Sequence, residues 1–120
     1  MSKSGNGAIV AWLRRLGPTR LLVFPPLFIA AVSLPMALRI VPPNGVYGLR
    51  TARTLSSPEI WYASNFRAGA AGVVLGILGA LIVVAIMRSR SMSDVTKALL
   101  AGATAVIVAM ASAAAGLLAA

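Results

Sequence analysis

Residues 68 to 87 read Ala68-Gly-Ala-Ala-Gly-Val-Val-Leu-Gly-Ile-Leu-Gly-Ala-Leu-Ile-Val-Val-Ala-Ile-Met87, and they contain no charged side chain. At about 1.5 Å per residue, a helix over this run is long enough to cross a hydrocarbon core of about 30 Å. Residues 98 to 120 are also uncharged and long enough to cross, although they are richer in alanine. These two runs predict an integral membrane protein.

A third apolar run, residues 21 to 40, contains Pro25, Pro26 and Pro35. Each proline lacks an amide donor and clashes with the preceding helical turn. A helix that began at Pro26 would reach only about 22 Å by Ile40. We therefore predict a kinked helix that begins near Pro18, and an all-α protein with three transmembrane helices.

The composition supports this class. The chain has 120 residues, of which 59% are hydrophobic and 11% charged, so it is expected to form one domain that cannot hide its apolar surface from water. The net charge of +9 would suggest nucleic-acid binding in a soluble protein, but here the basic residues flank apolar runs. We expect them to contact membrane lipids, and we expect no direct contact with nucleic acid.

The sequence contains no cysteine and no histidine, which excludes disulfides, thiolate and imidazole chemistry and the usual zinc or haem ligands. We therefore expect no metal and no cofactor. The two acidic residues, Glu59 and Asp94, are predicted at opposite membrane faces, so they cannot act as a catalytic pair. An enzyme is not expected, and no acidic residue lies within a span to couple ion transport.

The first 20 residues are basic. Trp12 stands among aliphatic residues beside Arg14 and Arg15, a pattern typical of a short helix in the membrane interface, and a frayed tail fits it equally well. Basic residues before an apolar run also suit a signal sequence, with Arg14 and Arg15 as a twin-arginine motif. Because the chain includes this segment from Met1, we expect it to be retained.

Short basic loops are retained in the cytoplasm, so the distribution of lysine and arginine predicts the orientation. One side has Lys3, Arg14, Arg15, Arg20, Arg88, Arg90 and Lys97, and the other has Arg50, Arg53 and Arg67, with Arg39 at a boundary. We predict a cytoplasmic N-terminus, a cytoplasmic turn over residues 88–97 and an extracytoplasmic C-terminus. Residues 41–67 then form a structured extracytoplasmic loop.

Two helix starts are readable. Ser57-Pro58-Glu59 combines an N-cap, a proline at the first helical position and an acid in the first turn, and Ser93-Asp94 is similar. The second helix is therefore expected to begin about ten residues before its membrane span.

Small residues recur along the second and third helices and predict helix packing. The glycines are Gly69, Gly72, Gly76 and Gly79 in the second helix, in register with Asn65, and Gly102 and Gly116 in the third, in register with Ala98, Ala105, Ala109 and Ser112. We expect these faces to contact partners in the same chain or in an oligomer. Tolerance of glycine without packing is the alternative.

The loop concentrates the polar and aromatic side chains of the chain. Pro43-Asn44-Gly45 predicts a turn, because proline fixes one dihedral angle and Asn-Gly tolerates positive φ. The candidate ligand-binding residues are Asn44, Tyr47, Arg50, Thr51, Arg53, Thr54, Trp61 and Asn65. Guanidinium groups pair with a carboxylate or phosphate, and a helix N-terminus at Pro58 favours an anion. Headgroup anchoring, or pairing of Glu59 with Arg50 or Arg53, is the alternative.

This loop resembles that of the SdpI family of bacterial membrane proteins. The family pattern of Pro-Asn, Gly-x-Arg, Thr, Trp and Asn is met by Pro43-Asn44, Gly48-Leu49-Arg50-Thr51, Thr54, Trp61, Ala63, Asn65 and Gly69. Phe66-Arg67 departs from the apolar pair expected after the asparagine, which leaves the role of Arg67 open.

The resemblance implies a multi-pass protein of the bacterial plasma membrane that provides immunity to, or senses, an extracellular antimicrobial peptide. It also implies signal transduction to a cytosolic repressor captured at the membrane. The other hypothesis is a small accessory subunit of a larger membrane protein complex. The expected partners are thus membrane lipids, an extracellular peptide, and a cytosolic repressor or complex subunits.

Overall fold

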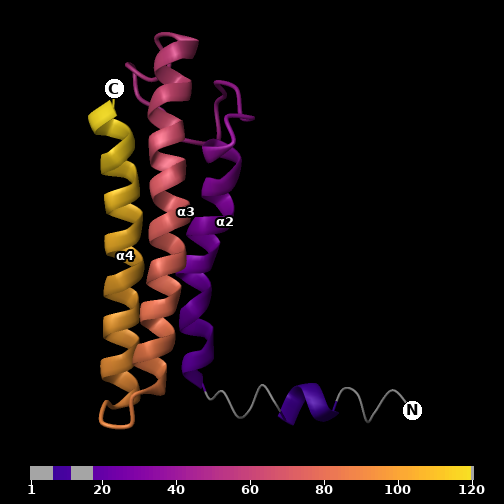
Figure 1. Ribbon diagram of the computed structural model, residues 1–120, viewed down its shortest axis with the longest axis vertical. Coiled ribbons are helices and arrows are strands. Elements are labelled where there is room, and N and C mark those ends of the chain that lie inside the picture. The colour runs from indigo at the N-terminus through magenta and orange to yellow at the C-terminus, as the bar shows by residue number, and fades with distance from the viewer. Residues whose placement is uncertain (1–6, 12–17, 120) are drawn as a thin grey trace.

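The computed structural model describes residues 7–11 and 18–119. Within these ranges it has no strand and contains three helices that are long and apolar enough to cross a membrane. Figure 1 shows them side by side, with α3 between α2 and α4. We call the end that includes residues 41–57 the loop end, and the end that includes residues 89–93 the turn end.

The first span is built from two helix types. A 3-10 helix, η1 (Pro18–Val23), leads into the α-helix α2 (Phe24–Ala37). Pro25 and Pro26 fall in the first turn of α2, where amide donors have no intrahelical partner, and only Pro35 lies inside the helix. A 3-10 helix rises about 2.0 Å per residue, so η1 and α2 together extend about 33 Å. The first span thus begins at Pro18, near the predicted start. Because a 3-10 helix rises further per residue than an α-helix, η1 makes the span long enough to cross the hydrocarbon core.

The second helix, α3 (Pro58–Arg88), has 31 residues. It begins where the sequence predicted, because the Ser57 hydroxyl accepts a hydrogen bond from the amide of Ile60 at 3.2 Å. At about 46 Å the helix exceeds the hydrocarbon thickness, so its first turns extend beyond the uncharged run. Trp61 and Asn65 lie on this extension.

The third helix, α4 (Asp94–Ala119), returns antiparallel to α3 after a short turn. Ser93 accepts a hydrogen bond from the amide of Thr96 at 3.2 Å, which caps the start of α4. The Lys97 ammonium donates to the carbonyl of Met87 at 3.0 Å, which satisfies a free carbonyl at the end of α3. These two bonds fix the turn end of the α3–α4 pair.

Glycines of α3 form its contact with α2. A Cβ on Gly76 would lie 2.7 Å from the Pro26 carbonyl oxygen and 2.8 Å from the Ala30 Cβ, and one on Gly69 would lie 2.5 Å from the Ala37 nitrogen. Gly72 faces Ser33 in the same way, and Gly79 faces both Val108 and Pro26. All four glycines are buried. The stripe on α3 therefore packs within this chain.

Only some of the small residues predicted to form the contact face of α4 are buried against the rest of the chain. Gly116 is buried against Ser64, Ala68 and Leu49, but a Cβ on Gly102 would meet nothing within 4 Å. The packing prediction for Gly102 does not hold within one chain. The buried positions of α4 are Ala101, Val108, Ser112 and Gly116, so Ser112 and Gly116 of the predicted face are buried, whereas Gly102 and Ala109 are exposed.

The N-terminal prediction is only partly covered. Residues 7–11 are helical, and residues 12–17, with Trp12, Arg14 and Arg15, lie outside the described residues. Among the described residues, four cations lie at each end, with Arg39 at the loop end. The predicted orientation therefore depends on the extra charge of Lys3, Arg14 and Arg15, and it stays a prediction.

Candidate functional site

The loop between α2 and α3 begins with a turn that the Asn44 side chain closes. Its Oδ1 accepts hydrogen bonds from the amides of Val46 and Tyr47 at 2.9 and 2.6 Å. Its Nδ2 donates to the carbonyls of Pro42 and Tyr47 at 2.9 and 3.0 Å. The predicted turn is present, and the Asn44 amide is committed to building it.

Asn65 connects this loop to α3. Its Oδ1 accepts from the Leu49 amide at 2.7 Å, and its Nδ2 donates to the Trp61 carbonyl at 3.0 Å. Gly48 has φ +105, and a Cβ there would lie 2.8 Å from Asn65 Oδ1 and would collide with Met36. Only glycine permits both this dihedral angle and this close approach. The Gly-x-Arg part of the pattern is therefore needed to place Leu49 against Asn65.

Thr51 and Thr54 form a second closed turn. Thr54 Oγ1 donates to the Leu49 carbonyl at 2.8 Å and accepts from the Thr51 amide at 2.8 Å. Thr51 Oγ1 accepts from the Thr54 amide at 3.0 Å. Thr54 has no exposed surface. These hydroxyls replace regular secondary structure in satisfying the loop backbone.

Trp61 also faces inward. Its side chain has no exposed surface, and its indole nitrogen donates to the Val41 carbonyl at 2.9 Å, across 20 residues of sequence. This bond joins the end of the first span to the start of α3. Trp61 is therefore a structural centre of the loop and cannot touch a ligand without rearrangement.

Sequence reasoning missed a further contact, between Arg39 and Phe66. Arg39 has φ 58 and ends α2 with a Schellman motif, in which its amide donates to Met36 and the Ile40 amide donates to Pro35. Its guanidinium lies 4.3 Å from the centre of the Phe66 ring. Phe66, which departs from the SdpI family pattern, thus contacts the Arg39 guanidinium through the face of its ring.

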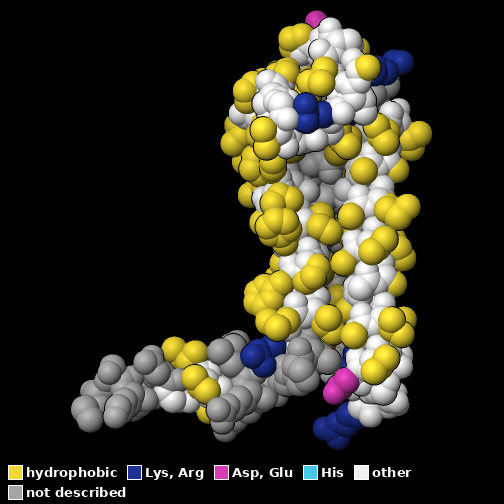
Figure 2. All heavy atoms as spheres, turned by 180° about the vertical axis from the view of Figure 1, so that it is seen from behind, with side chains coloured by type: hydrophobic (Ala, Val, Ile, Leu, Met, Phe, Trp, Pro, Cys, Tyr) yellow, Lys and Arg dark blue, Asp and Glu magenta, His cyan; other side chains and the backbone are white. Residues whose placement is uncertain are grey.

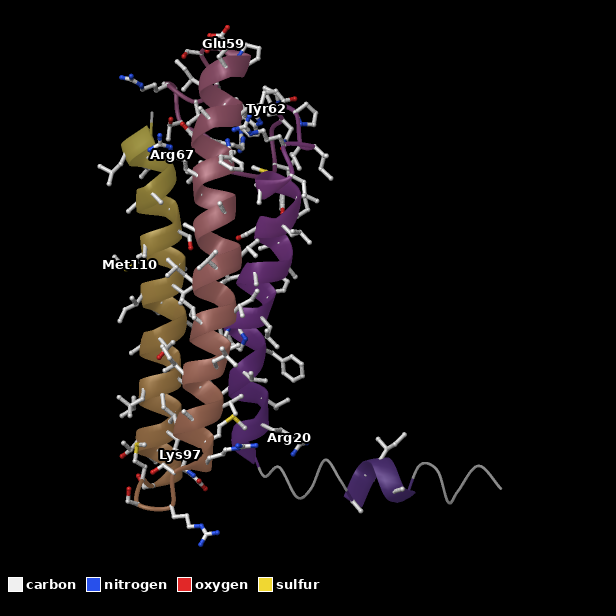
Figure 3. The ribbon with its side chains drawn as sticks, viewed as in Figure 1. Arg20, Glu59, Tyr62, Arg67, Lys97 and Met110 are labelled. Atoms are coloured by element: carbon white, nitrogen blue, oxygen red, sulfur yellow. The ribbon has the colours of Figure 1, made fainter. Side chains whose placement is uncertain are left out.

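The surface of the loop presents arginines. Arg50 and Arg53 are exposed, and the Arg50 Nε donates to the Asn44 carbonyl at 2.9 Å, which leaves its two terminal nitrogens free. Arg67 is exposed and lies near the C-terminal end of α4, and Glu59 lies at the tip of α3 (Figure 3). Tyr47 is half-buried, and loss of hydration raises the pKa of its hydroxyl above 10.0.

The predicted binding residues thus fall into two groups. Asn44, Thr51, Thr54, Trp61 and Asn65 hold the loop together, whereas Arg50, Arg53 and Tyr47 remain accessible. Among the described residues, no group of three His, Cys, Asp or Glu side chains could hold a metal ion. The chemistry that the loop offers is recognition of an anion by guanidinium groups.

A groove lies directly below the loop, between α2 and α4 (Figure 2). Its volume is about 250 Å³. Ile29, Val32, Ser33 and Met36 of α2 form one wall, Ala109, Ser112 and Ala113 of α4 form the other, and Asn65, Ala68 and Gly69 of α3 form the floor. Tyr47, Gly48 and Leu49 line its loop end. The sequence gives no signal for this groove.

Residues 40–119 match the model of the SdpI/YfhL protein family, and this range holds the loop, α3 and α4. The chain belongs to the SdpI/YfhL family. No curated protein and no solved structure matches it. The SdpI/YfhL match covers both the buried hydrogen-bonding residues and the exposed Arg50 and Arg53 of the loop.

Proposed function

We propose that this SdpI/YfhL protein gives a bacterium immunity to, or senses, an extracellular antimicrobial peptide. It crosses the plasma membrane three times, with its N-terminus in the cytoplasm and with the loop end and C-terminus outside. The family match over residues 40–119 and the three apolar helices support this proposal. A binding role rather than catalysis fits the separation of Glu59 and Asp94, which begin α3 and α4 at opposite ends.

The observation that carries the proposal is that one set of loop residues holds the backbone in place while another set is exposed to a ligand. Part-buried hydrogen bonds of Asn44, Thr54 and Asn65 fix its backbone, while Arg50 and Arg53 are exposed. A rigid backbone reduces the entropy lost when the guanidinium groups pair with a ligand. A peptide carboxylate is a suitable partner, because arginine binds it through two parallel hydrogen bonds.

Arg53→Gln and Arg50→Gln test this role, since neither side chain is buried. We expect the double variant, expressed in a sensitive bacterium that is challenged with secreted killing peptides, to reduce survival at least tenfold at normal membrane levels. Arg90→Gln, an exposed arginine at the turn end, is the matched control and should keep full protection. Full protection by the double variant would show that these arginines do not recognise the peptide.

Signal transduction to a cytosolic repressor would use the turn end, where Arg88 and Arg90 are exposed. A photo-crosslinker at Ser89 should capture a cytosolic protein only when the killing peptide is present. The same products with and without the peptide would contradict the signalling role and leave the immunity role untouched.

A second candidate, an accessory subunit of a larger membrane complex, is favoured by the exposed small residues of α4. Ala98, Gly102 and Ala109 are exposed, and Gly102 has open space beside it. In this case Gly102→Leu should reduce co-purification of partner subunits, while Arg53→Gln should not. Gly72 and Gly76 cannot serve this test, because they are buried against α2.

A further inference from the structure

The groove below the loop opens sideways and is closed toward the loop end. Leu49 packs against Gly116 of α4, and Gly48 packs against Met36 of α2. The segment Tyr47 to Leu49 therefore spans the gap between the two outer helices. A molecule that approaches along the helix axes from water meets this segment, whereas a molecule between α2 and α4 meets the groove directly.

The groove lies at the depth where headgroups give way to hydrocarbon. Its floor includes Asn65, Ala68 and Gly69, and Ala68 is the first residue of the uncharged run. On α2 it extends from Met36 to Ile29, about 10 Å further toward the middle of the span. The lateral opening consequently faces lipid and not water.

Polar side chains line the loop end of the groove together with apolar Leu49 and Met36, and the inner part is apolar. Tyr47 and Asn65 stand at the loop end, Ser33 stands one turn below Met36, and Ile29 and Ala109 line the inner part. Within the described residues, the Ser33 hydroxyl has no hydrogen-bond partner, although it faces the groove above Gly72. A hydroxyl in an apolar setting favours a ligand with an acceptor at that depth, such as an ester carbonyl.

The charge at the loop end favours an anion. Among the described residues, this end has Arg39, Arg50, Arg53 and Arg67, against one carboxylate, Glu59. Arg50 directly follows Leu49, a lining residue, and its two terminal guanidinium nitrogens are free. Phosphate, ester and acyl chain follow one another in a phospholipid in the same order as arginine, hydroxyl and apolar wall here.

We propose that the groove binds one acyl chain of an anionic phospholipid whose phosphate pairs with Arg50. Arg50 is shared with the proposed peptide contact, whereas the groove itself lies outside the residues proposed to recognise the peptide. The volume of about 250 Å³ suits part of a single chain. The closed loop end argues against a peptide that arrives from water, and the sideways opening favours a ligand already dissolved in the bilayer.

Trp61 provides a local probe of the groove. Its side chain has no exposed surface, and its ring lies 3.2 Å from the position of a Cβ on Gly48, which lines the groove. Trp12 is the other tryptophan of the chain, so a Trp12→Phe background leaves Trp61 as the only tryptophan. Lipids with brominated chains quench tryptophan fluorescence at short range.

The experiment uses the full chain with Trp12→Phe in phosphatidylcholine vesicles that contain brominated phosphatidylglycerol or brominated phosphatidylcholine. We expect phosphatidylglycerol to quench Trp61 with an apparent affinity about fivefold higher, the effect of roughly one basic residue beside an anionic lipid. Ala113→Leu, which fills the groove, and Arg50→Gln should each abolish this preference. Ala114→Leu, at an exposed neighbour that does not line the groove, should retain it.

Equal quenching by the two lipids in the parent protein would overturn the proposal. A preference that survives Ala113→Leu would also overturn it, because general attraction to the arginines would then be sufficient. If Ala113→Leu abolished protection against a killing peptide but left the lipid preference unchanged, the groove would be a peptide site and the lipid assignment would be wrong.

Discussion

The bond between Asn65 and the Leu49 amide is the best single point at which to test how the loop is held. Asn65 is 2% exposed, and its Oδ1 accepts from Leu49 at 2.7 Å. Asn65→Leu keeps a similar side-chain volume but removes this acceptor. An amide that loses its partner in a buried position costs about 1 to 3 kcal/mol. The Trp61 carbonyl is less affected, because it still accepts its helical bond.

We therefore expect Asn65→Leu to lower the local opening free energy at Leu49 by about 2 kcal/mol, which corresponds to roughly 30-fold faster amide exchange. Hydrogen exchange followed by mass spectrometry on protein in lipid nanodiscs measures this rate. Ser56→Ala is the control, because the exposed Ser56 hydroxyl bonds only to the Arg53 carbonyl and leaves no buried group unpaired. A Leu49 amide that exchanges within threefold of the wild-type rate would refute the role given to Asn65.

Three further predictions concern packing, backbone geometry and ionisation. Gly76→Ala should destabilise the protein by about 1 to 3 kcal/mol, because its Cβ would meet the Pro26 carbonyl oxygen at 2.7 Å. Gly102→Ala should instead stabilise α4 by up to about 1 kcal/mol, because a Cβ there meets nothing within 4 Å. Unfolding in mixed micelles compares the two variants, and equal effects would contradict the packing. Arg39→Gly should be more stable than Arg39→Ala by about 1 kcal/mol, because both variants lose the Phe66 contact but only glycine adopts φ 58 without strain. The same unfolding assay compares them, and the opposite order of stability would refute the left-handed conformation at the end of α2. The Tyr47 hydroxyl should ionise above pH 10.0 in the folded protein, as followed by the absorbance difference between wild type and Tyr47→Phe. The raised pKa means that the folded state favours the neutral form of Tyr47. The contribution of Tyr47 to the free energy of unfolding is therefore complete below pH 10 and is lost as the pH rises through the folded-state pKa. A Tyr47 hydroxyl that titrates below pH 10.0 would contradict its burial.

The sequence determined the features that depend on neighbouring residues. Charge-free runs gave the spans, Ser57-Pro58 and Ser93-Asp94 gave the helix starts, and Asn44 gave the turn. The α3 glycines were also readable, because their spacing reflects one helix face. Each of these signals acts within a few residues, where backbone geometry follows directly from side-chain type.

Only the tertiary structure decided the destinations of the polar side chains. Trp61 reaches Val41 and Asn65 reaches Leu49 across 20 and 16 residues, and nothing local indicates such partners. Sequence composition therefore grouped these residues with Arg50 and Arg53 as ligand contacts, although burial demands that they pair internally. Three other features likewise depend on how whole helices pack against one another, and no single segment determines them. They are the exposure of Gly102, the contact of Arg39 with the Phe66 ring, and the groove between α2 and α4.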